Sequence, residues 1–266
     1  MNKATRNKQG NSLSVVIITC NEERNIVRCI ESVKGLSDDI IVVDSGSTDA
    51  TQSLAAEAGA RVFVRKWDGY ASQKNFGNEQ AQNQRILSLD ADEVVSAKLA
   101  KSIKKVLIDH SEDTLFALNI LNNFEGKFIY HGGWYPDWHN RIFTKGAAQW
   151  TDYGVHETLD TCKNAKVMRL KGDVLHYTAP GKVMFREKMK HYAMLFARNR
   201  FENGVNYSSS KKYVSAVFRF MKEYVFKMGF LDGKAGWNIV CQNTWYTYLK
   251  YDYLENLYRM SLANQN

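Results

Sequence analysis

A short apolar run at residues 85–90, RILSLD, ends in the acidic side chains Asp90, Asp92 and Glu93. On extended backbone, residues two apart point the same way, so Asp90 and Asp92 can act together. Their oxygens suit Mg²⁺ or Mn²⁺ and leave coordination sites for substrate phosphates. The same acids can instead favour the start of a helix near Ser96, and we expect Glu93 to serve that helix. DxD spacing alone does not decide between these readings.

Polar residues also follow three other predicted strands. Short β-branched runs at 13–19, 39–44, 60–66 and 85–90 alternate with helical patterns, which predicts a Rossmann-like, mostly parallel sheet covered by helices on both faces. Ligands of such sheets bind outside the carboxyl ends of the strands. The loops at 19–22, 44–49, 65–68 and 90–93 therefore converge on one candidate site. No GxGxxG or GxxxxGK[ST] pattern follows the first strand, which argues against dinucleotide and P-loop sites.

The pattern changes twice farther along the chain. Beyond residue 113, strand-like runs follow one another with no helix between them, and after Pro180 the sequence is helical, basic and aromatic. We therefore predict a flexible N-terminus (1–12), an α/β domain (13–180, with halves 13–95 and 96–180) and a helical extension (181–266).

Composition restricts the partners. The net charge of +8 and pI near 9.2 indicate an anionic partner, either nucleic acid, phospholipid or a phosphorylated small molecule. Four scattered cysteines form no metal-thiolate spacing, and reduced thiols are typical of the cytoplasm. No apolar run reaches membrane-spanning length, so we expect a cytoplasmic protein.

The C-terminal extension carries the excess charge. Ten lysines and arginines face two glutamates between 182 and 222, an imbalance equal to the net charge of the chain. Residues 211–225 predict an amphipathic helix with aromatic and basic arcs. Two interpretations stay open. Such a helix can lie in an anionic membrane interface, or its apolar stripe can pack on the domain with its charges solvated.

Four motifs in order, TCNEERNI, VVDSGSTDAT, GYASQKNFG and SLDADE, resemble the nucleotide-sugar half of family 2 glycosyltransferases with the GT-A fold. The later run GGWYPDWHNRIF, then DYGVHETL and LHY, is similar to the branch with lipopolysaccharide inner-core β-1,4-glucosyltransferases. The resemblance covers residues 13–180 and implies that this domain is catalytic. The four motifs together are more specific than any one of them.

The resemblance implies a donor site with a divalent metal. Asp44 contacts the uracil, Asp90 lies on the ribose side and Asp92 ligates Mg²⁺ or Mn²⁺. DSGSTD has Ser45 where many relatives carry a second acid, which leaves Asp44 as the sole acid of that pair. The other implied nucleotide-binding residues are Thr19, Asn21, Glu22, Lys74 and Asn75.

Acceptor-side candidates follow. Glu157 is the predicted general base, because a carboxylate can take the hydroxyl proton and relatives carry an acid here, and His156 orients it. A surface glutamate and a core histidine stay alternatives, and His176 either completes the metal shell or is a core histidine. Aromatic faces stack on sugars but are as often plain core. The predicted sugar platform comprises Trp134, Tyr135, Asp137 and Arg141.

The sequence thus predicts a metal-dependent inverting transferase moving glucose from UDP-glucose to a heptose of the lipopolysaccharide inner core. It would work as a peripheral protein on the cytoplasmic face of the inner membrane, with a lipid-anchored glycan as acceptor. Capsule, teichoic or peptide acceptors are alternatives. A nucleic-acid-binding protein is the rival of another class, but it would leave Asp44, Asp90 and Asp92 without a purpose, so we expect no nucleic acid partner.

Overall fold

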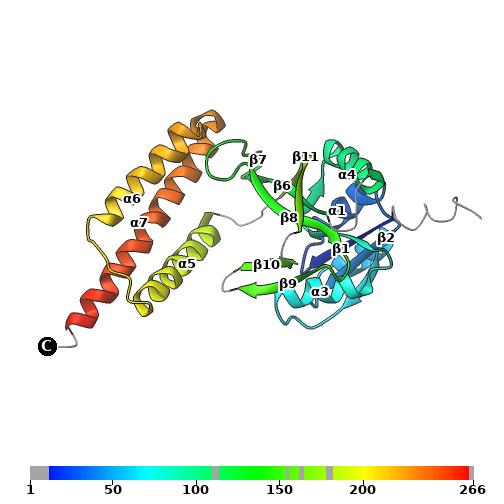
Figure 1. The fold of residues 1–266 in the computed structure, drawn as a ribbon, viewed down its shortest axis with the longest axis horizontal. Coiled ribbons are helices and arrows are strands. Elements are labelled where there is room, and N and C mark those ends of the chain that lie inside the picture. The colour runs from blue at the N-terminus through cyan, green and yellow to red at the C-terminus, as the bar shows by residue number, and fades with distance from the viewer. Residues whose placement is uncertain (1–11, 110–113, 154–155, 162–164, 178–181, 264–266) are drawn as a thin grey trace, which may run out of the picture. The chain divides into compact units, whose positions relative to one another are not determined.

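The computed structural model describes residues 12–109, 114–153, 156–161, 165–177 and 182–263. The chain forms two compact units, which Figure 1 colours by residue number. The first contains the residues up to Leu121 together with Asp137–Tyr177. The second combines Asn122–Pro136 with the chain beyond Tyr177. A segment from the middle of the sequence therefore belongs with the C-terminal helices.

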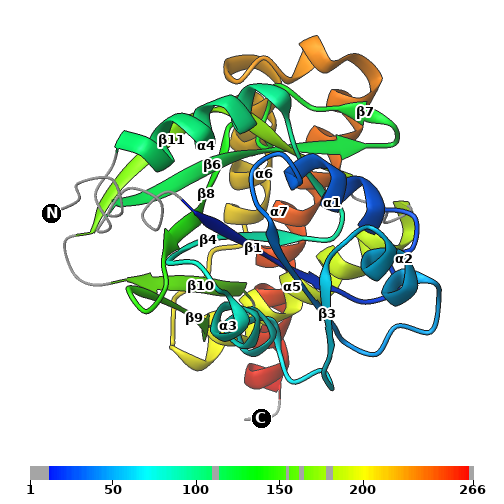
Figure 2. The same ribbon diagram turned by 90° about the vertical axis from the view of Figure 1, so that its right-hand side faces the viewer.

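The first ninety residues alternate strands and helices as predicted. The parallel strands lie in the order β3-β2-β1-β4, and Figure 2 shows them with their helices. The strands are β1 (Leu13–Thr19), β2 (Asp39–Asp44), β3 (Arg61–Val64) and β4 (Arg85–Asp90). The helices are α1 (Ile26–Val33), α2 (Thr51–Glu57) and α3 (Tyr70–Gln80).

Beyond β4 the same sheet continues with antiparallel pairs, in the order β4-β8-β6-β11-β5. This part comprises β5 (Glu93–Val95), α4 (Ala97–Asp109), β6 (Thr114–Phe124), β7 (Lys127–Phe128), β8 (Asp137–Thr144) and β11 (Lys166–His176). A separate hairpin, β9 (Ala148–Tyr153) with β10 (His156–Thr161), was not predicted from the sequence.

The sheet must curl, because β4 and β5 are adjacent in sequence but four places apart in the sheet. Four strand spacings in a flat sheet would span about 19 Å. The three residues from Asp90 to Glu93 reach at most about 10 Å. Only a curled sheet brings its far edge back to the end of β4. The DADE loop is the link that closes this curve.

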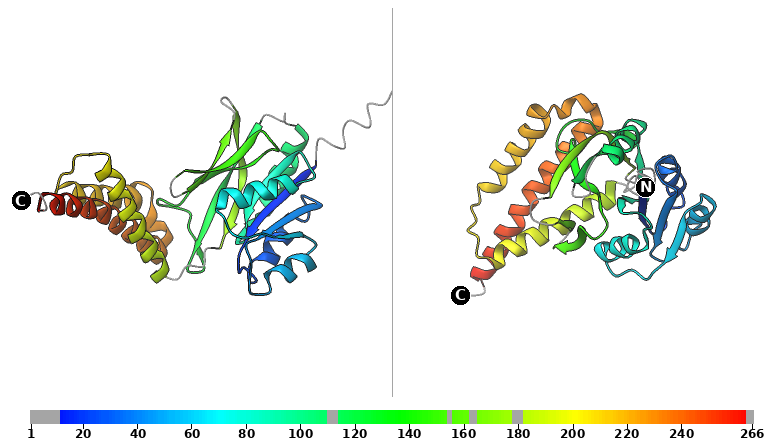
Figure 3. Two further views of the ribbon diagram at one scale, coloured as in Figure 1. Left: turned by 90° about the horizontal axis from the view of Figure 1, so that it is seen from below. Right: turned by 45° about the vertical axis from the view of Figure 1, so that its right-hand side comes forward.

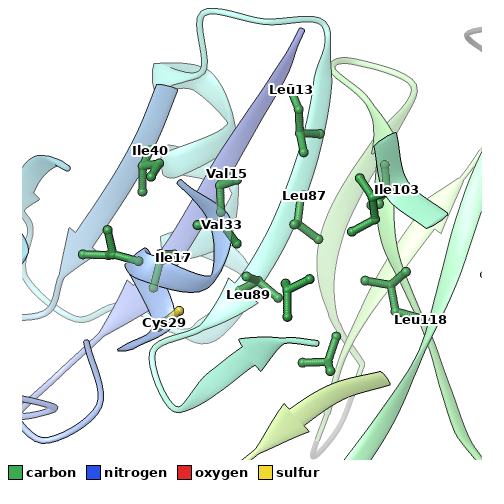
Figure 4. Packing of buried hydrophobic residues seen from close by; sticks show 14 of the residues in the cluster. Leu13, Val15, Ile17, Cys29, Val33, Ile40, Leu87, Leu89, Ile103 and Leu118 are labelled. Carbon is green, nitrogen blue, oxygen red and sulfur yellow. The ribbon is translucent and has the colours of Figure 1, made fainter. Parts of the chain in front are cut away.

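Buried side chains cover both faces of the parallel strands, which explains their continuous apolar runs. Val15 and Ile17 of β1 pack with Val33 of α1 on one face (Figure 4), while Val16 packs with Ala71 of α3 on the other. The helix α3 lies very close to the strands. A Cβ added at Gly77 would stand 2.4 Å from Val16 Cγ1.

The second unit is built from helices. They are α5 (Lys182–Glu202), α6 (Lys211–Phe220) and α7 (Gly233–Ala263), with a π-helical turn η1 (Met221–Phe226) and a 3₁₀ turn η2 (Gly229–Asp232) after α6. The long α7 packs against both α5 and α6, and Figure 3 shows these helices from two further sides. Ile129 and Phe124 join the segment Asn122–Pro136 to Ile239 of α7. In the described ranges, no helix has both the length and the hydropathy needed to span a bilayer.

Candidate active site

The carboxyl ends of three neighbouring strands meet at one edge of the sheet. In the strand registers, Thr19 of β1 pairs with Asp44 of β2, and Ile18 pairs with Asp90 of β4. The predicted convergence of these polar loops is therefore confirmed at the level of the backbone. The side chains around this edge form three groups: the acids of residues 90–93 with their partners, the loop after β2, and the contact between α3 and β9.

Asp90 lies between two cations. Its Oδ1 is 3.3 Å from Lys74 Nζ, and its Oδ2 is 3.5 Å from Arg141 Nη2. Lys74 is only 1% exposed, although it is a lysine, and its ammonium also lies over the ring of Trp150. Burial opposes ionisation of Asp90, but Lys74 and Arg141 outweigh it and hold the pKa of Asp90 well below its ordinary value. Asp90 is therefore a fixed anion with Lys74 beside it, and the contact of Lys74 with base or diphosphate stays a prediction.

The expected role of Glu93 at the start of the following helix is wrong. Glu93 does not serve that helix, because it lies in β5 and its Oε2 accepts the backbone N–H of Asp90 at 2.9 Å. Its Oε1 accepts a 2.8 Å hydrogen bond from Arg141 Nη2. Burial raises the pKa of Glu93, and Arg141 opposes that rise. Glu93 thus holds both the DADE loop and the guanidinium that faces Asp90.

The two predicted metal ligands, Asp92 and His176, lie side by side. Asp92 Oδ2 and His176 Nε2 are 3.1 Å apart, and the backbone N–H of Tyr177 donates to the Asp92 carbonyl. Burial lowers the pKa of His176, but the hydrogen bond to Asp92 and the negative charges of Asp92, Glu93 and Asp90 together outweigh it and raise that pKa. Both side chains are partly exposed. His176 therefore faces a carboxylate at a partly exposed position, and its part in the metal shell stays a prediction.

This pair fits a divalent cation as part of a ligand set. Adjacent ligands of an octahedral Mg²⁺ stand about 3 Å apart, close to the Asp92–His176 separation. Among the described residues, no cluster of three or more His, Cys, Asp or Glu could enclose a metal. The remaining ligands would have to be water or substrate oxygens. That is the usual arrangement for Mg²⁺ and Mn²⁺ with phosphates, and the imidazole favours Mn²⁺.

Asp44 organises the loop after β2. Its buried Oδ1 accepts the backbone N–H groups of Gly46 at 2.9 Å and Ser47 at 2.7 Å. Gln52 Nε2 donates to the same oxygen, and the Ser47 hydroxyl donates to Oδ2. The described hydrogen bonds of Asp44 are therefore internal to its loop. Contact with a uracil stays a prediction.

Asn21 clamps that loop from the first strand. Its backbone has a left-handed φ of 56°, and its Oδ1 accepts the Thr48 N–H at 2.8 Å. The Asn21 N–H donates to Ser47 Oγ at 2.8 Å. Asp49 accepts the N–H groups of Glu23 and Thr51, so it holds the two loops together at their backbones. TCNEE and DSGSTD therefore form one unit.

Glu22 is directed towards the site by a chain of polar contacts. Asn25 Nδ2 donates to Glu22 Oε2 at 2.5 Å, and Arg28 donates to Asn25 while its guanidinium stacks on Tyr177. Burial raises the pKa of Glu22, and the negative charge of Asp92 adds to that rise. The buried Thr19 hydroxyl has no hydrogen-bond partner within the described part of the chain, so a ligand can supply one.

Asn75 is hydrogen-bonded to the backbone of Trp150 in β9. Its amide donates to the Trp150 carbonyl at 2.8 Å and accepts the Trp150 N–H at 3.0 Å. Both functional ends of the side chain therefore hold β9 against α3. Its predicted contact with base or diphosphate stays a prediction.

The acceptor-side candidates lie on different elements of the structure. His156 and Glu157 open β10, opposite Tyr153 and Asp152, but their side chains lie outside the described residues. Trp134 packs edge-to-face on Phe124 within the second unit. The platform role stays a prediction.

The remaining platform candidates have separate neighbours. Tyr135 contacts Tyr130, Asp137 is 2.9 Å from His139, and Arg141 joins the Asp90 cluster. The structure therefore places Arg141 beside Asp90 and Glu93, and its part in an acceptor platform stays a prediction. The sequence did not indicate its pairing with Glu93, or the Arg28–Asn25–Glu22 chain. Glu22, Asn25 and Arg28 are spaced three residues apart at the start of a helix, and this spacing could have predicted their contacts.

Comparisons with known proteins show the family and the fold of the chain. An uncharacterized glycosyltransferase, RP128 of Rickettsia prowazekii, is 28% identical over 267 residues, spanning 96% of this chain and 89% of its own. The lipopolysaccharide core biosynthesis glycosyltransferase LpsC of Rhizobium meliloti is 38% identical over 105 residues, 38% of each chain. Residues 1–349 of S. aureus TarS, solved with UDP-GlcNAc, share the fold with a TM-score of 0.50 and 14% identity, over 94% of this chain and 92% of that one. The family model "Glycosyl transferase family 2" matches residues 14–192, so the chain belongs to glycosyl transferase family 2.

Proposed function

We propose that this family 2 transferase moves glucose from UDP-glucose to a heptose of the lipopolysaccharide inner core, with inversion and with a divalent metal. The observation that carries the proposal is the Asp92–His176 pair beside the Lys74–Asp90–Arg141 cluster. Similarity to LpsC, named for lipopolysaccharide core biosynthesis, supports the acceptor class. Capsule, teichoic and peptide acceptors are the alternatives.

The donor would bind at the edge formed by β1, β2 and β4. The ionised Asp90 would accept a ribose hydroxyl, and the unpartnered Thr19 hydroxyl offers a further polar contact. The loop shaped by Asp44 would border the base. The Lys74 ammonium, held beside Asp90, would add positive potential near the diphosphate.

Asp92 and His176 would hold Mn²⁺ or Mg²⁺ together with diphosphate oxygens. The bound cation would act as a Lewis acid that neutralises charge on the leaving diphosphate. Glu22 contributes a neighbouring carboxylate whose raised pKa reflects burial and Asp92.

Inversion at the anomeric carbon requires a base on the face opposite the leaving group. We assign that role to Glu157, which would take the proton of the acceptor hydroxyl, and assign its orientation to His156. Trp134, Tyr135 and Asp137 are the candidates for binding the acceptor sugar. A lipid-anchored acceptor would place the enzyme on the cytoplasmic face of the inner membrane.

The direct test measures UDP release from a panel of nucleotide sugars, with Mn²⁺ and core acceptors. The account predicts that UDP-glucose gives the fastest release. Glu157→Gln should lower turnover by about 10²–10⁴-fold, the usual contribution of a general base, while UDP binding is kept. A fully active Glu157→Gln variant would remove Glu157 from this role, and release from no nucleotide sugar would reject the proposed function.

A further inference from the structure

The amphipathic helix α6 presents its apolar side to solvent. Val214, Val217 and Phe218 follow helical spacing and are 66%, 64% and 63% exposed. Met221 and Val225 continue this stripe into η1 and are also exposed. A helix on a soluble protein normally buries such a stripe against its neighbour. The orientation of α6 is the reverse of that arrangement.

The side of α6 that packs on α7 carries a paired lysine as well as the ring of Phe220, which contacts Trp237. Lys212 Nζ lies 2.7 Å from Asp252 and 3.0 Å from Glu255, two acids of α7. Arg219 Nε lies 2.7 Å from the buried Glu223, whose other oxygen accepts a hydrogen bond from Asn243 of α7. The interpretation in which the apolar stripe packs inward and the charges are solvated therefore fails for Lys212 and Val217, whereas Phe220 does pack inward and Arg219 stays 41% exposed.

The turn between α6 and α7 extends the apolar surface. Phe226 is 74% exposed, and Met228, Phe230 and Leu231 are exposed beside it. We call this turn, residues 226–231, the apolar tip.

Close backbone packing gives the apolar tip a fixed shape. A Cβ on Gly236 would stand 2.0 Å from the Gly229 carbonyl oxygen, so only glycine fits there. Asp232 accepts the His131 backbone N–H at 2.8 Å, and Lys127 Nζ donates to the Asp232 carbonyl. These contacts anchor the turn to the segment Asn122–Pro136.

The exposed charges of residues 211–237 have one sign. The two acids of these residues, Glu223 and Asp232, are both buried. The exposed charged side chains are lysines, namely Lys222, Lys227 and Lys234, together with Lys211, whose ammonium lies over Tyr251 of α7. An apolar surface with exposed lysines in the same segment matches a bilayer with anionic headgroups.

We propose that the face formed by α6, η1 and the apolar tip docks into an anionic lipid bilayer, with Phe218, Phe226 and Leu231 entering the interface. The choice of partner rests on the proposed function, since a lipid-anchored acceptor lies at such a surface. A second copy of the chain fits this face less well. An isologous contact would bring its lysines against the same lysines of the partner.

The test compares binding to vesicles of phosphatidylcholine with phosphatidylglycerol against vesicles of phosphatidylcholine alone. The wild type should bind the anionic vesicles more tightly. The triple variant Phe218→Ser, Phe226→Ser, Leu231→Ser should bind them on the order of a hundredfold more weakly. Lys222→Gln with Lys227→Gln should weaken anionic binding about thirtyfold and leave neutral binding unchanged.

The matched control is the triple variant Ile108→Ser, Val167→Ser, Met260→Ser, whose side chains are 69%, 50% and 64% exposed elsewhere. It should bind the anionic vesicles as the wild type does. An equal loss in both triple variants, or no vesicle binding by the wild type, would overturn the proposal. A lipid-free dimer that the first triple variant abolishes would assign the face to a second copy instead.

Two further readouts separate folding and catalysis from docking. Both triple variants should keep the thermal midpoint of the wild type, because the substituted side chains are exposed; a large drop for the first alone would mean that the face is covered by protein. UDP release with a delipidated, water-soluble core acceptor should be unchanged in both. Vesicle binding without UDP release from any donor would reject the proposed function and keep the docking surface.

Discussion

Asp90 and Asp92 stand two positions apart, yet their surroundings give them different chemistry. Asp90 faces Lys74 and Arg141, so its charge is already balanced by protein cations. Asp92 faces only the partly exposed His176 among its described side-chain hydrogen bonds. A carboxylate beside an imidazole suits a metal better than one held between two cations.

The first prediction concerns Asp92. Asp92→Asn removes a charged oxygen ligand, so the affinity for Mn²⁺, measured by titration calorimetry with UDP present, should fall on the order of a hundredfold. Asp38→Asn, at an exposed carboxylate just before the amino end of β2, is the control and should leave that affinity unchanged. Equal Mn²⁺ affinity in wild type and Asp92→Asn would assign the metal elsewhere.

The second prediction concerns the Glu93–Arg141 pair, both of whose side chains are buried. Glu93→Gln removes the nearer of the two carboxylates that face Arg141 and leaves Asp90 at 3.5 Å, so the free energy of unfolding should fall by about 3 kcal/mol in urea denaturation. Glu79→Gln, at an exposed position, should change it by less than about 0.5 kcal/mol. Equal stabilities of the two variants would contradict the structural role of Glu93.

The positions of candidate site residues could be predicted from the sequence where those residues end or follow a strand. Asp90, Asp92 and His176 each end or follow an apolar run, so the pattern placed them at the sheet edge. The pairing of Glu93 with Arg141 joins residues 48 positions apart and depends on the register of β8. No local pattern encodes such a register, so Arg141 was interpreted as an acceptor residue.

At the scale of elements, α3 connects the core to the site. Gly77 lets this helix approach the sheet, Lys74 reaches Asp90, and Asn75 holds the hairpin β9–β10. One helix therefore links the sheet, the acidic cluster and the hairpin that begins the Glu157 strand.

A third prediction tests the close approach of α3. Gly77→Ala puts a methyl group 2.4 Å from Val16 Cγ1 and 3.1 Å from Val43 Cγ2. The overpacking should lower the free energy of unfolding by about 1–3 kcal/mol. Gly35→Ala meets only the far end of Lys104 at 3.9 Å and serves as the control, expected within about 0.5 kcal/mol of the wild type. A Gly77→Ala variant as stable as the control would mean that α3 and the strands are farther apart.

The fourth prediction distinguishes the two roles of Asn75. Asn75→Ala leaves the Trp150 N–H and carbonyl without their side-chain partner, so stability should fall by about 1–3 kcal/mol. UDP affinity should stay within about twofold, because both ends of the amide are already used by Trp150. Unchanged stability with a large loss of UDP affinity would restore Asn75 to the donor site.

Strands were predicted correctly where both of their faces are buried, because such strands have continuous apolar sequences. Residues 13–19, 39–44 and 85–90 were predicted as strands and are strands with those bounds. The hairpin strands AQWTDY and HETLDT are polar and short, so they gave no such signal. The place of β5 at the far edge of the sheet depends on curling, which arises only when the whole sheet is assembled.

At the scale of the whole molecule, exposed lysines and exposed apolar side chains occur in the same segment, residues 211–234. The composition shows a net charge of +8, and the helical pattern predicts the two arcs of α6. Part of the apolar arc is exposed, while Lys212 pairs with acids of α7 and Phe220 contacts Trp237. That pairing between helices was not visible in the sequence.

The fifth prediction is a salt series on this surface. Raising the salt from 0.1 M to 1 M shortens the Debye length from about 10 Å to about 3 Å, which weakens attraction between exposed lysines and anionic lipid. Vesicle binding should therefore weaken but persist, because the apolar contribution remains. Complete loss at high salt would show that charge alone mediates binding and would contradict insertion of Phe218, Phe226 and Leu231.

The most direct test of the central claim measures UDP release from UDP-glucose with heptose-containing core acceptor. The account predicts release only when donor, acceptor and Mn²⁺ are all present, and a loss on the order of a hundredfold or more in Asp92→Asn. Release that continues at the full rate in excess chelator, with Asp92→Asn as active as the wild type, would contradict it.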